Sequence, residues 1–125
     1  MYNEKVMEQF AHPKNVGFIE NASGRGKVGN PTCGDIMEIT LDIDENDIIR
    51  DAKFRTFGCA AAIATSSMAT EMVIGMSVDE ARNLKNEDVI NELGELPPQK
   101  IHCSVLAEEA IKDAIEDYLS KKNNK

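Results

Sequence analysis

Hydrophobic and polar residues alternate along two neighbouring segments in the first half of the chain. Between residues 37 and 43 every second position is apolar and the positions between them are polar, which is the period of a strand that covers a core with one face. The alternation returns in residues 48–57, after the turn sequence DEND, with Ile48, Ala52 and Phe54 on one side. The two segments predict an antiparallel hairpin, and the sequence SGRGKVG ahead of them indicates a third strand.

Most of the remaining segments show the three-to-four-residue spacing of helices. The clearest lies near the C-terminus, where an apolar stripe is formed by Val105, Leu106, Ala110, Ile111, Ala114, Ile115, Tyr118 and Leu119. Residues 59–72 are apolar on most sides, as in a helix that is buried against a sheet. Shorter helices are indicated over residues 2–10, which Pro13 stops, at the capping box sequence SVDE in 77–80, and over residues 86–94.

These elements predict an α+β fold in a single domain that spans residues 1–125. We expect a small three-stranded antiparallel sheet packed against four to five helices, the last of them long, with a short polar tail from about residue 120. A chain of 125 residues buries about two-thirds of the surface that its unfolded state exposes, so it needs neither disulfides nor a metal merely to fold.

The charge balance limits the classes of partner. The chain has 14 basic and 22 acidic residues, a formal net charge of −8, and such an excess repels the phosphate backbone of nucleic acids. No run of about 18 apolar residues occurs, and the N-terminal sequence MYNEKVMEQF carries charges where a secretory signal needs an apolar stretch. We therefore expect a cytoplasmic protein that binds neither nucleic acid nor membrane.

Three cysteines stand at boundaries between the predicted elements. Cys33 precedes the first hairpin strand, Cys59 opens the buried helix, and Cys103 stands at the start of the last helix. An odd number of cysteines at long spacings cannot form a closed disulfide framework. The N-terminus of a helix favours the thiolate, which suits Cys59 and Cys103 to bind a metal or to act as nucleophiles. The alternative is that each cysteine is a small buried hydrophobic residue.

Two further groups stand beside the cysteines. Asp35 lies two residues after Cys33, so both face the same side in an extended segment, and His102 immediately precedes Cys103. Taken alone, Asp35 is more typical of a turn and His102 of a surface or core position. Together with the cysteines they make five groups, whereas a tetrahedral zinc ion or a two-iron cluster needs four. Because a carboxylate binds iron less tightly than a thiolate, the set indicates a metal site that releases its contents.

Four parts of the sequence carry a resemblance to a known family. They are YNEKVMEQF followed by HPKNVG, GNPTCGD, FRTFGCAAAIATSS and LPPQKIHCS. On these segments, residues 2–119 resemble the IscU/NifU-type scaffolds on which iron–sulfur clusters are assembled, whose fold is also α+β. The resemblance implies that the three cysteines are cluster-binding thiolates and that the neighbouring carboxylate and imidazole complete the site. The residues of the implied site are Cys33, Asp35, Cys59, His102 and Cys103.

The same resemblance implies how such a protein works. A cysteine desulfurase of the IscS/NifS type delivers sulfur as a persulfide, and iron and electrons arrive from donors such as ferredoxin. A [2Fe-2S] cluster then forms and passes to apo iron–sulfur proteins. Cys103 matches the position that accepts the persulfide in relatives. The scaffold itself is not an enzyme, and zinc can occupy the same ligands in the absence of iron.

Two details refine the resemblance. LPPQK, residues 96–100, departs from the family's usual LPPVK, which a chaperone of the HscA type recognises. The polar Gln99 disfavours that partner, and the proline pair equally suits a stiff entry to the last helix. Relatives named SufU carry an insertion and lack the histidine before the last cysteine, whereas this chain has His102. It therefore resembles the stand-alone scaffold type, and the sequence leaves the choice between monomer and homodimer open.

Two other classes of function are alternatives to the scaffold. A zinc enzyme needs a general base, such as the glutamate of an H-x-E sequence combined with C-x-x-C, and the chain has no such pattern. A zinc-binding sulfur acceptor or interaction module without cluster transfer needs only a closed site of four ligands. The fifth group favours the scaffold, and the stoichiometry and exchange rate of the bound metal would separate the two.

Overall fold

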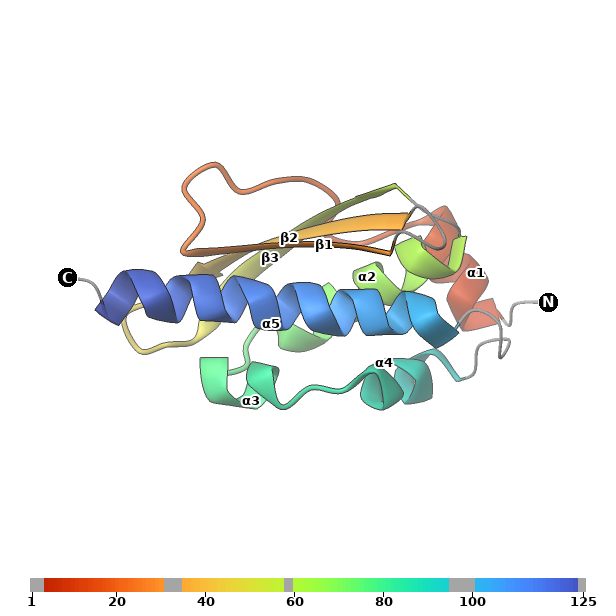
Figure 1. The fold of residues 1–125 in the computed structure, drawn as a ribbon. Helices are drawn as coiled ribbons and strands as arrows, with labels where there is room; N and C mark the ends of the chain where they lie inside the picture. Colours follow the sequence, from red (N-terminus) through yellow and green to blue (C-terminus); the bar gives the residue numbers. More distant parts are fainter. Residues whose placement is uncertain (1–3, 31–34, 58–59, 95–100, 124–125) are drawn as a thin grey trace.

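The computed structural model describes residues 4–30, 35–57, 60–94 and 101–123. Within these ranges the elements are α1 (Glu4–Ala11), β1 (Gly24–Asn30), β2 (Asp35–Ile43), β3 (Ile49–Phe57), α2 (Ala60–Val73), α3 (Val78–Arg82), α4 (Asn86–Leu93) and α5 (Ile101–Asn123). The strands form one antiparallel sheet in the order β1-β2-β3, and α5 extends along its whole length (Figure 1). The predicted α+β fold with a long C-terminal helix is confirmed, including the third strand.

The hairpin of β2 and β3 has a change of register near its turn. The apolar positions of β2 are fully buried, as the alternation predicts for Met37, Ile39 and Leu41. The pairing of the two strands shifts between Asp42 and Ile43, which pair with Asp51 and Ile49. The shift changes the side of the sheet on which the residues at the start of β3 face. Ile49 is therefore fully buried, and Ile48 is half-buried. The prediction that Ile48 belongs to the core side was wrong because the alternation of a single strand cannot reveal such a shift.

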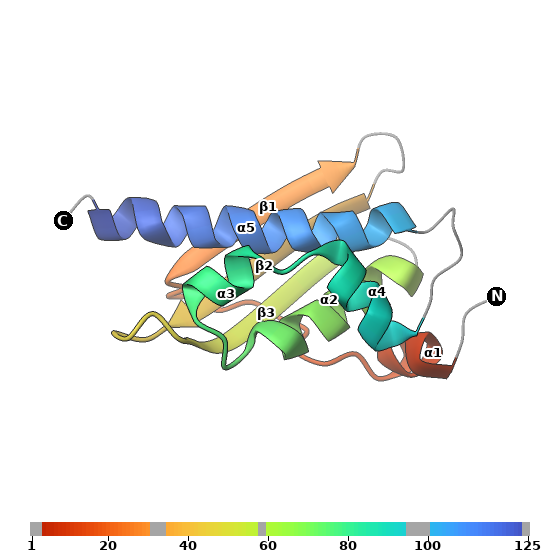
Figure 2. The same ribbon diagram turned by 90° about the horizontal axis from the view of Figure 1, so that it is seen from below.

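Helices α2 and α5 cover one face of the sheet (Figure 2). α5 packs along β1 and β2, α2 packs against β3, and the smaller helices lie around these two. The stripe predicted for α5 is buried at Leu106, Ala110, Ile111, Ala114 and Ile115. Removing such apolar surface from water, at about 25 cal/mol per Å², is the main force that holds the helix to the sheet. Among the described helices, none has the length and apolar composition needed to cross a membrane.

The last turns of α5 are tied to the turn between β2 and β3. The Tyr118 hydroxyl donates a hydrogen bond to Asp47, and Lys122 Nζ lies 2.9 Å from both carboxylate oxygens of Asp47. The bond from Tyr118, followed by that from Lys122, lowers the pKa of the Asp47 carboxyl. α5 consequently continues to Asn123, so most of the stretch predicted as a polar tail is helical.

A row of hydroxyl groups on α2 holds the N-terminal part of the chain. The Ser67 hydroxyl accepts a 2.7 Å hydrogen bond from the Lys14 amide and donates one to Gln9. The Asn15 side-chain amide donates to the Thr70 hydroxyl at 3.2 Å. Ser67 and Thr70 are fully buried, and buried hydroxyls need such partners. These bonds fix α1 and the segment after it against α2.

Candidate functional site

Five element ends lie together at one end of the molecule, which we call the site end. β1 and β3 end there, and β2, α2 and α5 begin there (Figures 1 and 2). Termini and connections held by a packed sheet and helices are where binding groups are commonly placed. We therefore expect the predicted ligands at the site end.

Each of the five predicted ligands lies within two residues of one of these element ends in the sequence. Asp35 is the first residue of β2, and His102 and Cys103 lie in the first turn of α5. Cys33 and Cys59 lie outside the described residues, in the short segments between β1 and β2 and between β3 and α2. Among the described side chains, no group of three or more His, Cys, Asp or Glu residues could hold a metal ion.

Strand pairing fixes which backbone positions are neighbours at the site end. Asn30 pairs with Asp35, and Ile36 pairs with Phe57. The segment that contains Cys33 thus connects two paired residues, and Cys59 follows Phe57 by two positions. The sheet therefore brings the chain on both sides of Cys33 next to the chain that leads to Cys59.

The contact between β1 and α5 adds the last helix to this arrangement. A Cβ on Gly24 would lie 2.1 Å from the carbonyl oxygen of Ala114, and one on Gly26 would lie 2.1 Å from that of Ala110. Two residues of strand thus match four residues of helix, because both advance by about 6 Å. Two more steps of the same size, each of two residues in β1 and four in α5, lead from Gly26 to Asn30, the last residue of β1, and from Ala110 to His102. The end of β1 is therefore level with the first turn of α5.

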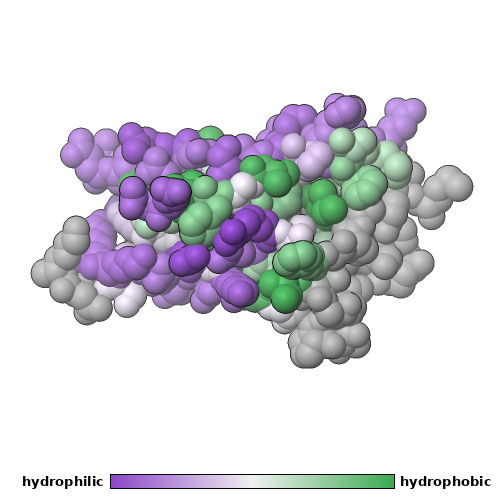
Figure 3. Space-filling view, turned by 90° about the horizontal axis from the view of Figure 1, so that it is seen from above, coloured by the Kyte–Doolittle hydropathy of each residue, from purple (hydrophilic) through white to green (hydrophobic). Residues whose placement is uncertain are grey.

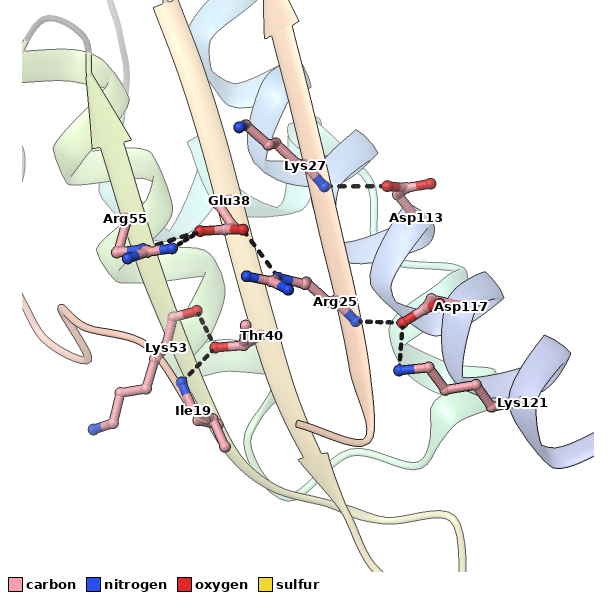
Figure 4. A network of polar contacts seen from close by, with 10 residues as sticks. All are labelled: Ile19, Arg25, Lys27, Glu38, Thr40, Lys53, Arg55, Asp113, Asp117 and Lys121. Carbon is pink, nitrogen blue, oxygen red and sulfur yellow. Dashed lines mark hydrogen bonds and ion pairs between the residues drawn. The ribbon is translucent and has the colours of Figure 1, made fainter. Parts of the chain in front are cut away.

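Carboxylates of α5 lock this register through the backbone of β1. The Arg25 amide donates a 3.0 Å hydrogen bond to Asp117 Oδ2, and the Lys27 amide donates a 3.1 Å bond to Asp113 Oδ2 (Figure 4). β1 is an edge strand, and the outward N–H groups of an edge strand need partners of their own. Asp113 and Asp117 supply them, so the helix and the strand are joined by directional bonds as well as by packing.

The sequence contains a signal for this lock. Gly24 and Gly26 are two residues apart in a strand, and Asp113 and Asp117 are four residues apart in a helix. These spacings match the geometry of a strand that lies directly on a helix. The pattern becomes informative once the two segments, which are about ninety positions apart, are known to be neighbours.

The opposite face of the sheet carries a charged cluster around Glu38. Arg25 Nε lies 3.1 Å from Glu38 Oε2, and Arg55 Nε lies 2.9 Å from Oε1 (Figure 4). The guanidinium carbons of Arg25 and Arg55 also lie 4.6 and 4.4 Å from the centre of the Phe18 ring. Partial burial acts to raise the pKa of Glu38, but the hydrogen bonds and charges of Arg55 and then Arg25 outweigh it, so the pKa is lowered.

Glu38→Gln is expected to destabilise the fold near neutral pH and to have a smaller effect in acid. Since the pKa of Glu38 is below its ordinary value of 4.5 in the folded state, its ion pairs contribute fully above that value. The contribution is lost as the pH falls through the lowered pKa. Urea unfolding of both proteins between about pH 7 and pH 3 should show free energies of unfolding that converge in acid. A difference that stays constant over this range would contradict the assignment.

Comparisons with known proteins give a consistent result. The family model described as the NifU-like N terminal domain matches residues 1–125. The chain is 54% identical over 121 residues to the iron-sulfur cluster assembly scaffold protein IscU of Aquifex aeolicus, covering 96% of this chain and 77% of that protein. It is 52% identical over 127 residues to the protein of the same name from Escherichia coli K12, covering 99% and 98%.

A solved structure supports the same fold. It is described as a putative iron-sulfur cluster assembly scaffold protein for the SUF system from Fervidobacterium islandicum. It matches this chain with a TM-score of 0.75 and 27% sequence identity, and the match covers 91% of this chain and 96% of that one. The arrangement of sheet and helices described above is thus also found in a crystal structure.

Proposed function

Because this chain belongs to the NifU-like N-terminal domain family, we propose that it is a scaffold on which [2Fe-2S] clusters are assembled and from which they are transferred. The membership carries the proposal, together with relatives that are named as cluster assembly scaffolds over nearly the full length of this chain. In this role the cluster is cargo, and the protein is not an enzyme.

We propose that the cargo is held by the five groups at the site end. The proposal is supported by the strand pairing next to Asp35 and by the β1–α5 register, which brings the first turn of α5 to the same level. Thiolates hold iron firmly, and a carboxylate is exchanged more readily. A set that mixes both can keep a cluster during assembly and give it up afterwards. The proposed set is Cys33, Asp35, Cys59, His102 and Cys103.

Sulfur enters this scheme through Cys103. Its thiolate attacks the outer sulfur of the persulfide on a cysteine desulfurase, the sulfur–sulfur bond of the donor breaks, and the donor thiolate leaves. The sulfur transferred to Cys103 must take up two electrons to become sulfide. Ferrous iron that becomes ferric supplies part of them, and an electron donor such as a ferredoxin supplies the rest. The implied partners are therefore the desulfurase, the electron donor and the apo iron–sulfur proteins that receive the cluster.

Binding of zinc and binding of a chaperone are less well supported than cluster assembly. The donor set of thiolates, an imidazole and a carboxylate also suits zinc, so a zinc ion in a purified sample would not exclude the scaffold function. Gln99 in LPPQK lies outside the described residues. The expectation that an HscA-type chaperone is disfavoured therefore remains a prediction, as does the cytoplasmic location.

Anaerobic reconstitution tests the proposed function. The protein is incubated with ferrous iron, cysteine, a reductant and a cysteine desulfurase, and the visible absorption of a [2Fe-2S] cluster is followed. An apo-ferredoxin is then added, and its own cluster spectrum is measured. We expect a cluster that forms on the scaffold and moves to the ferredoxin. A protein that binds zinc stoichiometrically, forms no cluster and delivers none would instead be a zinc module.

Asp35→Ala is expected to make the bound cluster more persistent. Loss of the exchangeable carboxylate leaves the cluster on firmer ligands, so we expect its loss to a chelator and to oxygen to be about tenfold slower than in the wild type. The decay of the visible absorption measures this rate. Asp51→Ala, which removes a carboxylate from β3 near its far end, is the matched control and should leave the rate unchanged. Unchanged or faster loss in Asp35→Ala would contradict the role of the carboxylate.

A further inference from the structure

The face of the sheet opposite α5 is covered unevenly. The segment between α1 and β1 lies over the part of this face that is further from the site end. There the Ile19 amide donates to the Thr40 hydroxyl at 3.1 Å, and residues 15–17 run along the edge of β3, where the Gly17 amide donates to the Phe54 carbonyl at 2.9 Å. The part nearer the site end carries Ile36 and Phe57, which are 40% and 78% exposed. One part of the sheet surface is thus closed by the chain itself, and the other faces solvent.

The exposed part forms a hollow with apolar and basic sides, which we call the rim hollow. It encloses about 370 Å³ and is lined by Lys27, Ile36, Glu38, Arg55, Thr56 and Phe57. Ile36 and Phe57 are direct partners across β2 and β3, so their side chains form one apolar patch. In the view onto this face, hydrophobic residues gather toward the site end and hydrophilic residues prevail at the other end (Figure 3). An exposed aromatic side chain beside a concave surface is typical of a protein-binding site.

The charge of the rim hollow is opposite to that of the whole chain. Arg25, Lys27 and Arg55 provide three positive charges in and beside it, and Glu38 is bound by both arginines. The local excess is therefore positive, although the formal net charge of the chain is −8. A partner that is itself acidic would be repelled by most of this protein and attracted here. Such a contrast orients the encounter of two proteins.

The position of the rim hollow indicates which partner it suits. Ile36 directly follows Asp35, the proposed exchangeable ligand, and Phe57 precedes Cys59 by two residues. The proposed sulfur acceptor, Cys103, belongs to α5, which packs on the other face of the sheet. A protein in the rim hollow thus lies next to the site end on the face of the sheet that α5 does not cover, so α5 remains accessible to the sulfur donor.

We propose that the rim hollow is the docking surface for an acidic cluster acceptor, a protein that presents carboxylates around an apolar side chain next to its own ligand cysteines. The carboxylates face Lys27 and the two arginines, and the apolar side chain packs against Phe57 and Ile36. This inference rests on the proposed scaffold function and adds the surface and the chemistry of the partner to it.

The test measures binding of an acidic apo-ferredoxin to the cluster-free protein. We expect Phe57→Ser and Lys27→Glu each to raise the dissociation constant about tenfold or more. Lys27→Glu should act mainly on the association rate and should weaken its dependence on salt concentration, since it removes electrostatic attraction. Lys85→Glu makes the same charge change at an exposed position directly before α4, a helix on the other side of the molecule (Figure 2), and should leave the dissociation constant within about twofold of the wild type.

Two outcomes would overturn the proposal. One is wild-type affinity in both rim variants, or an equal loss of affinity in Lys85→Glu, which would mean that no particular surface is used. The other is a loss of affinity for the cysteine desulfurase while the affinity for the ferredoxin is kept, which would assign the rim hollow to the sulfur donor. Because binding is measured without a cluster, it is independent of the reconstitution experiment. A wild-type protein that forms no cluster would contradict the scaffold function itself.

Discussion

Gly26→Ala is expected to lower the free energy of unfolding by about 3–5 kcal/mol, a large part of the total stability of a small domain. The added Cβ would lie 2.1 Å from the Ala110 carbonyl oxygen and 2.6 Å from the Ala114 amide nitrogen. Both are backbone atoms of α5 and cannot rotate away, so β1 must move off the helix. That movement also breaks the bonds from the β1 amides to Asp113 and Asp117, which leaves polar groups without partners.

Chemical denaturation with a spectroscopic readout of helix content measures this change. Lys27→Ala, on the next residue of the same strand and with an exposed side chain, is the control and should stay within about 0.5 kcal/mol of the wild type. If Gly26→Ala were as stable as Lys27→Ala, the close contact of β1 with α5 would be wrong. The register argument for the site end would then lose its basis.

Cys103→Ser is expected to abolish sulfur loading. A serine hydroxyl is not ionised near neutral pH and cannot attack the outer sulfur of a persulfide, whereas a thiolate at the start of a helix is well suited to do so. Incubation with cysteine and a desulfurase, followed by mass spectrometry without reductant, should show the added sulfur on the wild type. We expect more than about a tenfold reduction in the variant.

Cys33→Ser and Cys59→Ser are the matched variants for this experiment. Each removes one thiol of the proposed ligand set, so both should fail to hold a normal cluster while they still accept sulfur. Normal loading of Cys103→Ser, combined with loss of loading in one of the other two, would move the acceptor role to that cysteine. The three variants together therefore separate sulfur acceptance from cluster binding.

The secondary structure could be predicted well where one face of an element is buried. The alternation in β2 and the stripe in α5 are consequences of burial on one side, and the structure shows the expected residues in the core. The capping box at Ser77 and Glu80 is likewise a local feature, and both of its hydrogen bonds are present at 3.2 Å. The side on which Ile48 faces was predicted wrongly because it depends on the pairing of β3 with another strand.

For the candidate site, too, some features could be predicted from the sequence and others only from the structure. The identities of the five proposed ligands come from the sequence, through short segments that resemble a family. A common location for them could not be derived from spacing, because Cys33 and Cys103 are separated by most of the chain. The backbone of β1, β2 and α5 shows how the flanking elements come together, and roles for the five side chains remain proposals for the experiments above.

The sequence by itself determined the fold class, the boundaries of most elements and the kind of chemistry, since periodicity and local motifs are properties of neighbouring residues. The tertiary structure decided what depends on residues that are far apart, such as the bond from Arg25 to Asp117 across 92 positions and the exposure of Phe57 beside Ile36. The physical reason is that burial of one face produces a periodic pattern of apolar residues within a segment. The register between two packed elements is set by contacts between residues that are far apart, and the sequence of each segment alone does not show which residues meet.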